Sequence, residues 1–231
     1  MDITCISDLH GFYPDLPGGD LLLLAGDYTA AGKLTQWGEF FNWLEKQNYE
    51  KKILIAGNHD NFLETAFPKS QEEADDIREI EDLLDIKVDF EYLCDSGTEY
   101  KGLKIWGSPW TNWFHGVNPK CKSFMVSESK LENKFKKIPS DTNILITHSP
   151  PYGILDGIPV MYDGTHFHAG SESLNNIVLS VERLPNLKCH IFGHIHEMGG
   201  RQFETNFSKF INCSYVNEKY KPVNKPIRFH L

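Results

Sequence analysis

The sequence of 231 residues has no apolar run long enough to cross a membrane, since the longest uninterrupted one extends only from Leu21 to Ala25. Its first residues, Met1 to Thr4, do not form the basic region and apolar segment of a secretory signal. We therefore expect a cytoplasmic protein that has no membrane partner. Neither observation bears on what the protein does.

Cysteine and positive charge are also scarce. The five cysteines are scattered, odd in number and never in Cys-x-x-Cys spacing, which argues against a disulfide framework or a cysteine zinc site. Lys and Arg number 23 against 32 Asp and Glu, which gives a formal net charge of -9. Proteins that bind extended nucleic acid usually have an excess of basic residues to replace counterions on phosphates. Extended nucleic acid is therefore not an expected partner.

Short apolar segments that end in polar side chains are the main feature of the sequence. In the clearest case, the strand-like run Ile53 to Ala56 is followed by Gly57, Asn58, His59 and Asp60. Ligands of α/β proteins bind at the carboxyl ends of strands, so these side chains could form part of a site. A polar turn is an equally good interpretation of this one segment, because Gly-Asn is also a turn signal.

The same arrangement recurs at four further predicted strands, and this recurrence favours a site. Together the polar groups at strand ends are Asp8, His10, Asp27, Asn58, His59, His148, His194 and His196. Carboxylate, imidazole and amide groups are ligands of borderline divalent metals such as Mn, Fe, Zn and Ni. They are too many for one structural zinc ion, which takes four ligands. Two divalent ions bridged by one carboxylate would use all of these groups.

In type, order and spacing, these residues resemble the calcineurin-like metallophosphoesterase superfamily. The shared pattern is Asp-x-His, Gly-Asp, Gly-Asn-His-Asp, a later His and Gly-His-x-His, and it extends from Ser7 to His196. The segments Thr147–Tyr152 and Phe192–Glu197 are similar to the branch near class III cyclic-nucleotide phosphodiesterases and brain-type metallophosphoesterase domain proteins. The resemblance implies a two-sheet β-sandwich with helices on both outer faces. The strand order itself indicates an α/β protein with an antiparallel part, and no linker divides residues 1–231, so we expect a single domain.

The resemblance also implies a role for each residue that matches the family pattern. One metal ion would be held by Asp8, His10, Asp27 and His196, and the other by Asp27, Asn58, His148 and His194. Asp27 would bridge the two ions. His59 matches the catalytic histidine of the family, and Asp60 would orient its ring. Leu9 stands where many relatives have a small polar residue, but it is not a ligand position.

From this resemblance we expect a dinuclear-metal phosphoesterase. Water between the two ions would lose a proton and attack phosphorus, while His59 would protonate the leaving oxygen. A small phosphodiester, such as a cyclic nucleotide, is the favoured substrate, and Mn is the favoured metal for activity. The alternatives are a phosphomonoesterase, including a protein phosphatase, and an inactive protein-interaction scaffold of the same fold. The sequence does not determine the oligomeric state.

Two further segments could contribute to substrate binding. Ser108 to Gly116 contains three aromatic residues and could form a hydrophobic plug beneath the loop. It could instead form a pocket wall in which Trp113 stacks on a nucleobase. His166 and His168 lie in a loop outside the shared family pattern. Either histidine could approach the substrate phosphate, although histidines in surface loops are common.

Hydrophobic periodicity predicts the remaining elements. Trp37, Phe40, Phe41 and Leu44 follow helical spacing and indicate a helix whose apolar stripe packs in the core. Two short alternating runs indicate antiparallel strands in a second sheet. The predicted helices are 33–47, 68–84, 127–137 and 171–184, and the alternating runs are 88–93 and 103–106.

Overall fold

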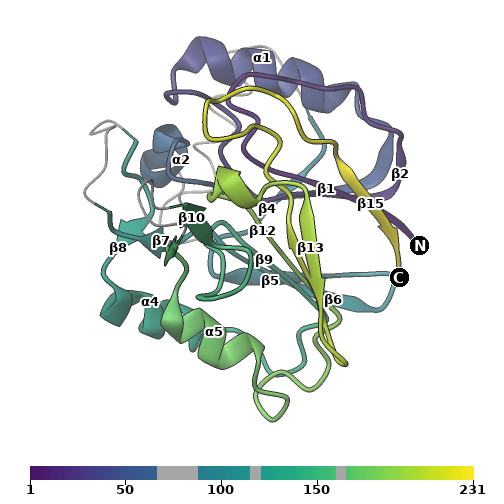
Figure 1. Cartoon of the computed structure of the whole chain (residues 1–231). Helices are drawn as coiled ribbons and strands as arrows, with labels where there is room; N and C mark the ends of the chain where they lie inside the picture. Colours follow the sequence, from purple (N-terminus) through teal and green to yellow (C-terminus); the bar gives the residue numbers. More distant parts are fainter. Residues whose placement is uncertain (67–87, 115–120, 160–164) are drawn as a thin grey trace.

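The structure, a computed structural model, describes residues 1–66, 88–114, 121–159 and 165–231. Two β-sheets lie face to face, and helices cover the outer side of each sheet (Figure 1). This arrangement confirms the predicted two-sheet sandwich. The helix predicted for residues 68–84 lies outside the described residues. No helix in the described ranges combines the length and apolarity needed to span a bilayer.

The first sheet has the strand order β15-β1-β2-β3-β4. Its strands are β1 (Asp2–Ile6), β2 (Gly19–Leu24), β3 (Tyr49–Leu54), β4 (Glu91–Tyr92) and β15 (Ile227–His230). Strands β1 to β4 are parallel to one another, and β15 pairs antiparallel with β1. Helix α1 (Leu34–Glu45) covers the outer face of this sheet (Figure 1).

The second sheet has the strand order β13-β14-β12-β9-β6-β5. Its strands are β5 (Ser96–Tyr100), β6 (Leu103–Ser108), β9 (Ile144–Thr147), β12 (Cys189–Phe192), β13 (Arg201–Glu204) and β14 (Lys209–Asn212). The four central strands are parallel, whereas β5 and β13 pair antiparallel at the edges. Helices α4 (Glu128–Phe135) and α5 (Glu172–Val178) cover its outer face (Figure 1).

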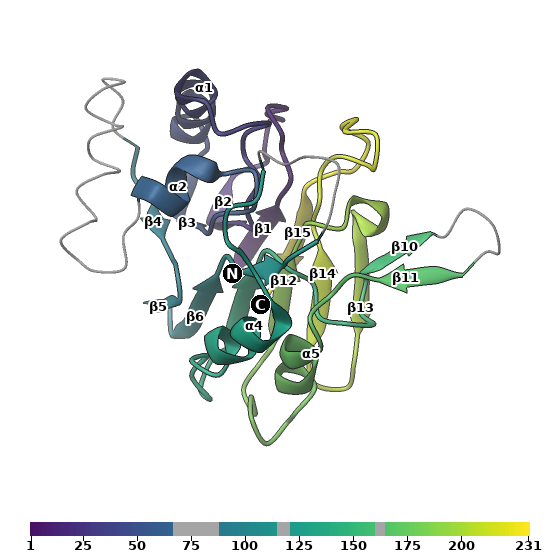
Figure 2. The same cartoon turned by 90° about the vertical axis from the view of Figure 1, so that its left-hand side faces the viewer.

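Smaller elements surround one edge of the sandwich. They are α2 (Asn61–Ala66), β7 (Thr111–Asn112), β8 (Met125–Val126), β10 (Gly157–Pro159), β11 (His166–His168) and the 3-10 helix η2 (His196–Met198). Strands β7 and β8 pair with each other, as do β10 and β11. The hairpin of β10 and β11 projects from the body of the protein (Figure 2) and packs against η2.

Alternation along the strands divides the core into three apolar layers. In β2, Leu21 and Leu23 point into the layer between the sheets, whereas Leu22 and Leu24 contact α1. A third layer lies between the second sheet and the helices α4 and α5. Full burial of each such side chain contributes about 1.5–3 kcal/mol. The strands that carry the polar groups therefore end at firmly fixed positions.

Two sequence-based predictions about these elements were wrong. Residues 88–93 were expected in the second sheet, but β4 pairs parallel with β3 in the first sheet. The antiparallel partner of β6 is β5 instead. Alternation reports which face of a strand is buried and not which strand it pairs with. Helix α5 also ends earlier than predicted, although Ser171 caps it by accepting a hydrogen bond from the Leu174 N–H at 3.2 Å.

Candidate metal centre

The polar groups predicted as ligands gather where strands of both sheets end. Asp8 and His10 follow β1, Asp27 follows β2, and the others follow β3, β9 and β12. Possible ligand atoms of Asp8, His10 and His196 lie within 4.8 Å of one another, as do those of Asp27, His148 and His194. The structure therefore brings together residues that are up to 188 positions apart in the sequence.

The backbone at these positions adopts unusual conformations. Asp8, His10, Asp27 and His194 have positive φ angles of 52°, 45°, 57° and 70°. Such left-handed residues other than glycine are uncommon and tend to occur at functional sites. Each one turns the chain sharply just past a strand, so that its side chain is directed across the end of the sheets.

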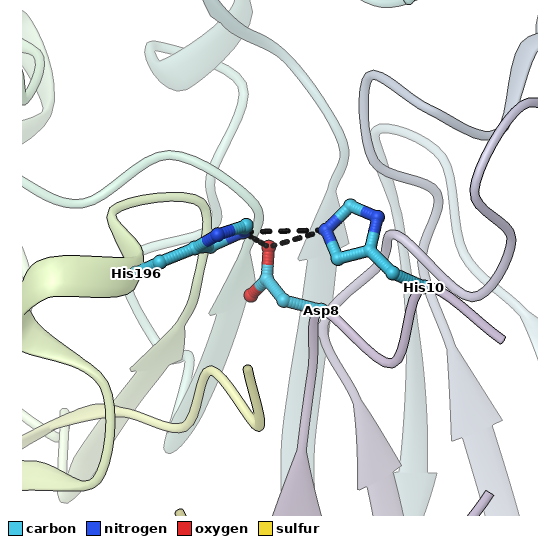
Figure 3. Close-up of side chains that lie close together, drawn as sticks. All are labelled: Asp8, His10 and His196. Carbon is cyan, nitrogen blue, oxygen red and sulfur yellow. Dashed lines mark hydrogen bonds and ion pairs between the residues drawn. The ribbon is translucent and has the colours of Figure 1, made fainter. Parts of the chain in front are cut away.

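A first cluster consists of Asp8, His10 and His196 (Figure 3). Nε2 of His10 lies 3.2 Å from Nε2 of His196, which in turn lies 3.1 Å from Oδ1 of Asp8. The other Asp8 oxygen, Oδ2, accepts hydrogen bonds from the hydroxyls of Ser7 at 2.6 Å and Ser214 at 2.8 Å. These two serines hold the carboxylate so that Oδ1 faces the two histidines.

A second cluster contains Asp27, Asn58, His148 and His194. Nδ1 of His148 donates to the Ala25 carbonyl at 2.8 Å, which leaves Nε2 as the unprotonated nitrogen of a neutral ring. That Nε2 lies 3.1 Å from Oδ1 of Asn58 and 3.5 Å from Oδ2 of Asp27. Asn58 donates from Nδ2 to the Cys121 carbonyl, so its Oδ1 is the atom that faces His148. Once the His148 ring is neutral, three lone pairs converge here, and a cation would satisfy all of them.

Asp27 lies between the two clusters. Its Oδ2 is 3.7 Å from Nε2 of His10 and 3.5 Å from Nε2 of His148, whereas Oδ1 accepts the backbone N–H of His59 at 2.8 Å. Gly57 allows this close approach, because a Cβ atom there would lie 2.2 Å from Oδ1 of Asp27. Carboxylate, imidazole and amide donors grouped around one shared carboxylate suit a dinuclear divalent metal centre.

His59 lies beside this centre but is held differently from the sequence-based expectation. Its Nδ1 donates to the Ala30 carbonyl at 2.9 Å. The carboxylate of Asp60, expected to orient this ring, instead accepts backbone N–H groups of Asp27, Gly57 and Tyr28 at 2.7–3.1 Å. The expectation was wrong because the residue after His59 turns back under the strand ends. Asp60 thus fixes the loops that carry the ligands.

The electrostatics of the metal-free site favour a negative Asp27 surrounded by histidines. Burial alone would lower the pKa of His59, but the Asp27 carboxylate, the Cys121 side chain and the hydrogen bond to Ala30 together outweigh burial and raise that pKa to about 10. A similar balance raises the pKa of His148 to about 9. Burial lowers the pKa of both His10 and His194 to about 3, so these rings are neutral and ready to bind a cation.

A cavity of about 430 Å³ opens beside the centre. Its polar floor includes Asp27, Asn58, His59, His194 and His196, and its aromatic walls include Trp113, Phe114, Phe167 and Tyr220. Pockets that combine apolar walls with a few convergent polar groups are typical of binding sites for small molecules. The cavity is therefore the space in which a substrate can meet the centre.

In the aromatic segment around β7, one residue has the predicted role of a hydrophobic plug and two have the predicted role of a pocket wall. Trp110 is partly buried and packs on Phe124, with ring centroids 5.4 Å apart, as expected for a plug. Trp113 and Phe114 are 51% and 40% exposed and line the cavity, as expected for a wall. Both interpretations of the sequence therefore describe part of the segment.

The two loop histidines also differ from each other. His168 lines the cavity, and its Nδ1 donates to the buried Asp156 carboxylate at 2.7 Å. His166 is exposed and is not among the described residues that line the cavity. Sequence reasoning missed Ser214, Glu218 and Tyr220, since they follow no motif. Glu197, which also lines the cavity, could have been found because it directly follows Gly-His-x-His.

A four-layer sandwich with paired clusters of carboxylate and histidine at its strand ends defines a class of metal-dependent hydrolases. The family profile described as calcineurin-like phosphoesterase matches residues 1–198. The chain belongs to this family, and it is therefore a metal-dependent hydrolase of phosphoesters. This result confirms the superfamily expected from the strand-end motifs.

Relatives place the chain in the branch of metallophosphoesterase domain-containing proteins. Human metallophosphoesterase domain-containing protein 1 is 33% identical over 240 residues, which cover 97% of this chain and 69% of that protein. UPF0046 protein C25E10.12 of Caenorhabditis elegans is 31% identical, over 99% of this chain and 80% of its own length.

Solved structures show the same fold at low sequence identity. The protein TT1561 of Thermus thermophilus has a TM-score of 0.58 and 14% identity, and the match covers 94% of this chain and 89% of that one. The phosphopantetheinyl hydrolase of Mycobacterium tuberculosis has a TM-score of 0.56 and 14% identity, with 94% and 90% covered. At this identity the similarity concerns the fold alone.

Proposed function

We propose that the protein hydrolyses small phosphodiesters, including cyclic nucleotides, with two divalent ions and His59. The observation that carries this proposal is that His59 and members of both ligand clusters line one aromatic cavity; these members are Asp27, Asn58, His194 and His196. Asp8, His10, Asp27 and His196 would hold one ion, and Asp27, Asn58, His148 and His194 the other. When bound, such ions lower the pKa of water and neutralise charge on phosphoryl oxygens.

His59 is the residue best placed to protonate the leaving oxygen. Its ring is fixed by the Ala30 carbonyl at Nδ1, lines the cavity, and lies 4.6 Å from the His10 ring between centroids. In the metal-free site, Asp27, Cys121 and the Ala30 carbonyl together outweigh burial and raise the pKa of His59 to about 10, which favours the imidazolium form that a proton donor needs. Its backbone N–H also holds Oδ1 of Asp27, so His59 supports the bridging carboxylate as well.

The charge of the cavity wall, outside the metal centre, favours a diester over a monoester. Glu197 and Glu218 line it, and no Lys or Arg does so among the described residues. A diester carries one negative charge at neutral pH, whereas a monoester carries nearly two and is repelled more strongly by these carboxylates. The aromatic walls can contact the organic groups that a diester carries on both sides of phosphorus. Mn²⁺ is our choice for reconstitution, because oxygen and nitrogen donors accept it.

The leaving-group dependence of His59→Ala tests the proposal. A p-nitrophenolate leaves readily without a proton, whereas the ribose alkoxide of a cyclic nucleotide does not. We expect kcat for a cyclic nucleotide to fall about 10²–10⁴-fold, the usual contribution of a general acid, and kcat for bis-p-nitrophenyl phosphate to fall much less. Similar losses on both substrates at full metal content would contradict the general-acid role.

The matched control is His166→Ala, which removes an exposed histidine that does not line the cavity. This variant should retain the kcat of the wild type on both substrates. Metal content is measured by elemental analysis for every variant. A metal-loaded wild type that hydrolyses only monoesters would refute the diesterase proposal, and one that hydrolyses no phosphoester would favour a scaffold.

A further inference from the structure

Tyr220 lies over the metal ligands although it comes from a loop near the end of the chain. Its ring centroid is 4.8 Å from that of His10, 5.2 Å from that of His196 and 6.2 Å from that of His59. The ring meets His10 and His196 nearly at right angles, at 79° and 88°. Tyr220 lies outside the matched residues 1–198, so the family profile assigns it no role.

The loop holds Tyr220 in a conformation that has a cost. Tyr220 has a φ of 54°, a left-handed value that is rare for an aromatic residue. Asn217 braces this loop: its Oδ1 accepts the N–H groups of Lys219 and Lys221, both at 3.0 Å, and its carbonyl accepts the Tyr220 N–H at 2.8 Å. Strained residues that their surroundings fix so firmly often belong to functional sites.

The loop that carries Tyr220 begins with a hydrogen bond to the cluster of Asp8, His10 and His196. The Ser214 hydroxyl donates to Oδ2 of Asp8 at 2.8 Å, and Val216 and Pro222 form an antiparallel bridge across the loop. The chain thus leaves β14 beside Asp8, turns at Asn217 and returns with the Tyr220 ring above His10 and His196.

The exposed surface of Tyr220 faces the cavity. The residue is 46% exposed and lines the cavity together with Phe114. Phe114 lies beside the other cluster, with its ring centroid 5.8 Å from that of His194. In the described part of the chain, an aromatic ring that lines the cavity thus lies beside each ligand cluster: Tyr220 beside one and Phe114 beside the other.

We propose that Tyr220, positioned by Asn217, determines specificity by packing its ring against an aromatic ester group of the substrate. This inference rests on the proposed function, because it names the wall that contacts the organic part of the diester. It assigns the contact to the ring and not to the hydroxyl. The site would accordingly prefer aryl or nucleoside esters of phosphate over small alkyl esters.

Binding of two phosphonates to the Mn²⁺-loaded protein tests the contact without catalysis. Phenylphosphonate and methylphosphonate share the metal-binding group, but only the first has a ring, and neither has an ester bond to hydrolyse. In Tyr220→Ala we expect the Kd of phenylphosphonate, measured by calorimetry, to rise about tenfold, as for loss of one stacked ring, and that of methylphosphonate to stay unchanged. Tyr220→Phe should bind both ligands as the wild type does, since it keeps the ring.

Two further variants separate positioning from general damage to the fold. Asn217→Ala loosens the brace and should weaken phenylphosphonate selectively, by less than Tyr220→Ala does. Val223→Ala shortens an exposed apolar side chain in the same loop, outside the described lining of the cavity, and should change neither affinity. Equal weakening of both phosphonates in Tyr220→Ala, or no preference for phenylphosphonate in the wild type, would overturn the proposal.

Activity is measured in parallel to keep the two proposals apart. A wild type that fails to hydrolyse bis-p-nitrophenyl phosphate would refute the diesterase function and leave the phosphonate comparison intact. A wild type that hydrolyses it, with a Tyr220→Ala variant of unchanged KM and unchanged phosphonate affinities, would refute the role of Tyr220 alone.

Discussion

Metal binding should release a proton from His148, and the pKa of this residue determines how strongly the proton competes with the metal ion. In the metal-free protein the pKa of His148 is about 9, because Asp27, Asp8 and the hydrogen bond to the Ala25 carbonyl together outweigh the effect of burial. A metal ion can use Nε2 only after its proton has left, since Nδ1 is engaged by the Ala25 carbonyl. At pH 7 the ring is about two pH units below its pKa, so only about one molecule in a hundred has the free nitrogen, which weakens binding by about 3 kcal/mol.

The direction of the pH dependence follows from the same values. Raising the pH from 6.5 towards 9 removes the competing proton, so Mn²⁺ affinity should increase about tenfold per pH unit and level off above pH 9. His10 and His194, whose pKa values burial lowers to about 3, are already neutral throughout this range and should release nothing.

Calorimetry in buffers of different ionisation enthalpy measures the protons released at pH 7. We expect at least about one proton per protein for the wild type, because His148 is almost fully protonated at this pH. His148→Gln should release about one proton fewer, whereas His166→Ala, in the exposed hairpin, should match the wild type. A heat of Mn²⁺ binding that does not depend on the buffer, together with a flat affinity between pH 6.5 and 8, would refute this reasoning.

Two other predictions concern the bridge and the cavity wall. Asp27→Ala should lose both ions and nearly all activity, because Oδ2 is the carboxylate oxygen nearest to both His10 and His148; elemental analysis that still finds two tightly bound ions would exclude the bridging role. Trp113→Ala should weaken a nucleotide substrate by about 1–3 kcal/mol through lost base stacking, and should affect bis-p-nitrophenyl phosphate less. Equal changes in KM for the two substrates would instead favour a packing role for Trp113.

The strand-end groups could be predicted because their signal is local. An apolar run followed by Gly-Asn-His-Asp, or Gly-His-x-His, marks a strand and its polar end within ten residues, and parallel strands bring such ends to one edge of a sheet. Which strand pairs with which is not encoded in such a short segment. Residues 88–93 alternate as an edge strand does, but the alternation could not show that β3, rather than β6, completes their hydrogen bonds.

Contacts made by loops escaped prediction for a related reason. His59 is oriented by a backbone carbonyl of Ala30, an atom that every residue possesses, so no sequence pattern could single it out. Tyr220 and His10 lie near opposite ends of the sequence, yet their rings are in contact. Only the fold of the Asn217 loop brings the two rings together, and isolated aromatic residues in polar turns are not diagnostic of a site.

The left-handed backbone conformations at Asp8, His10, Asp27 and His194 imply that the candidate metal centre lowers the stability of the folded protein. Each such conformation costs about 1–3 kcal/mol, and Nδ1 of His10 is also buried without a hydrogen-bond partner among the described residues. Exchanging His10 for glycine removes both penalties at once but also removes the ring contacts of a buried side chain, so a higher Tm for metal-free His10→Gly than for the metal-free wild type would show that the penalties are the larger effect. Loss of activity and gain of stability then lie one substitution apart. In that case, a lineage that no longer needs the chemistry could keep the folded domain after this one substitution.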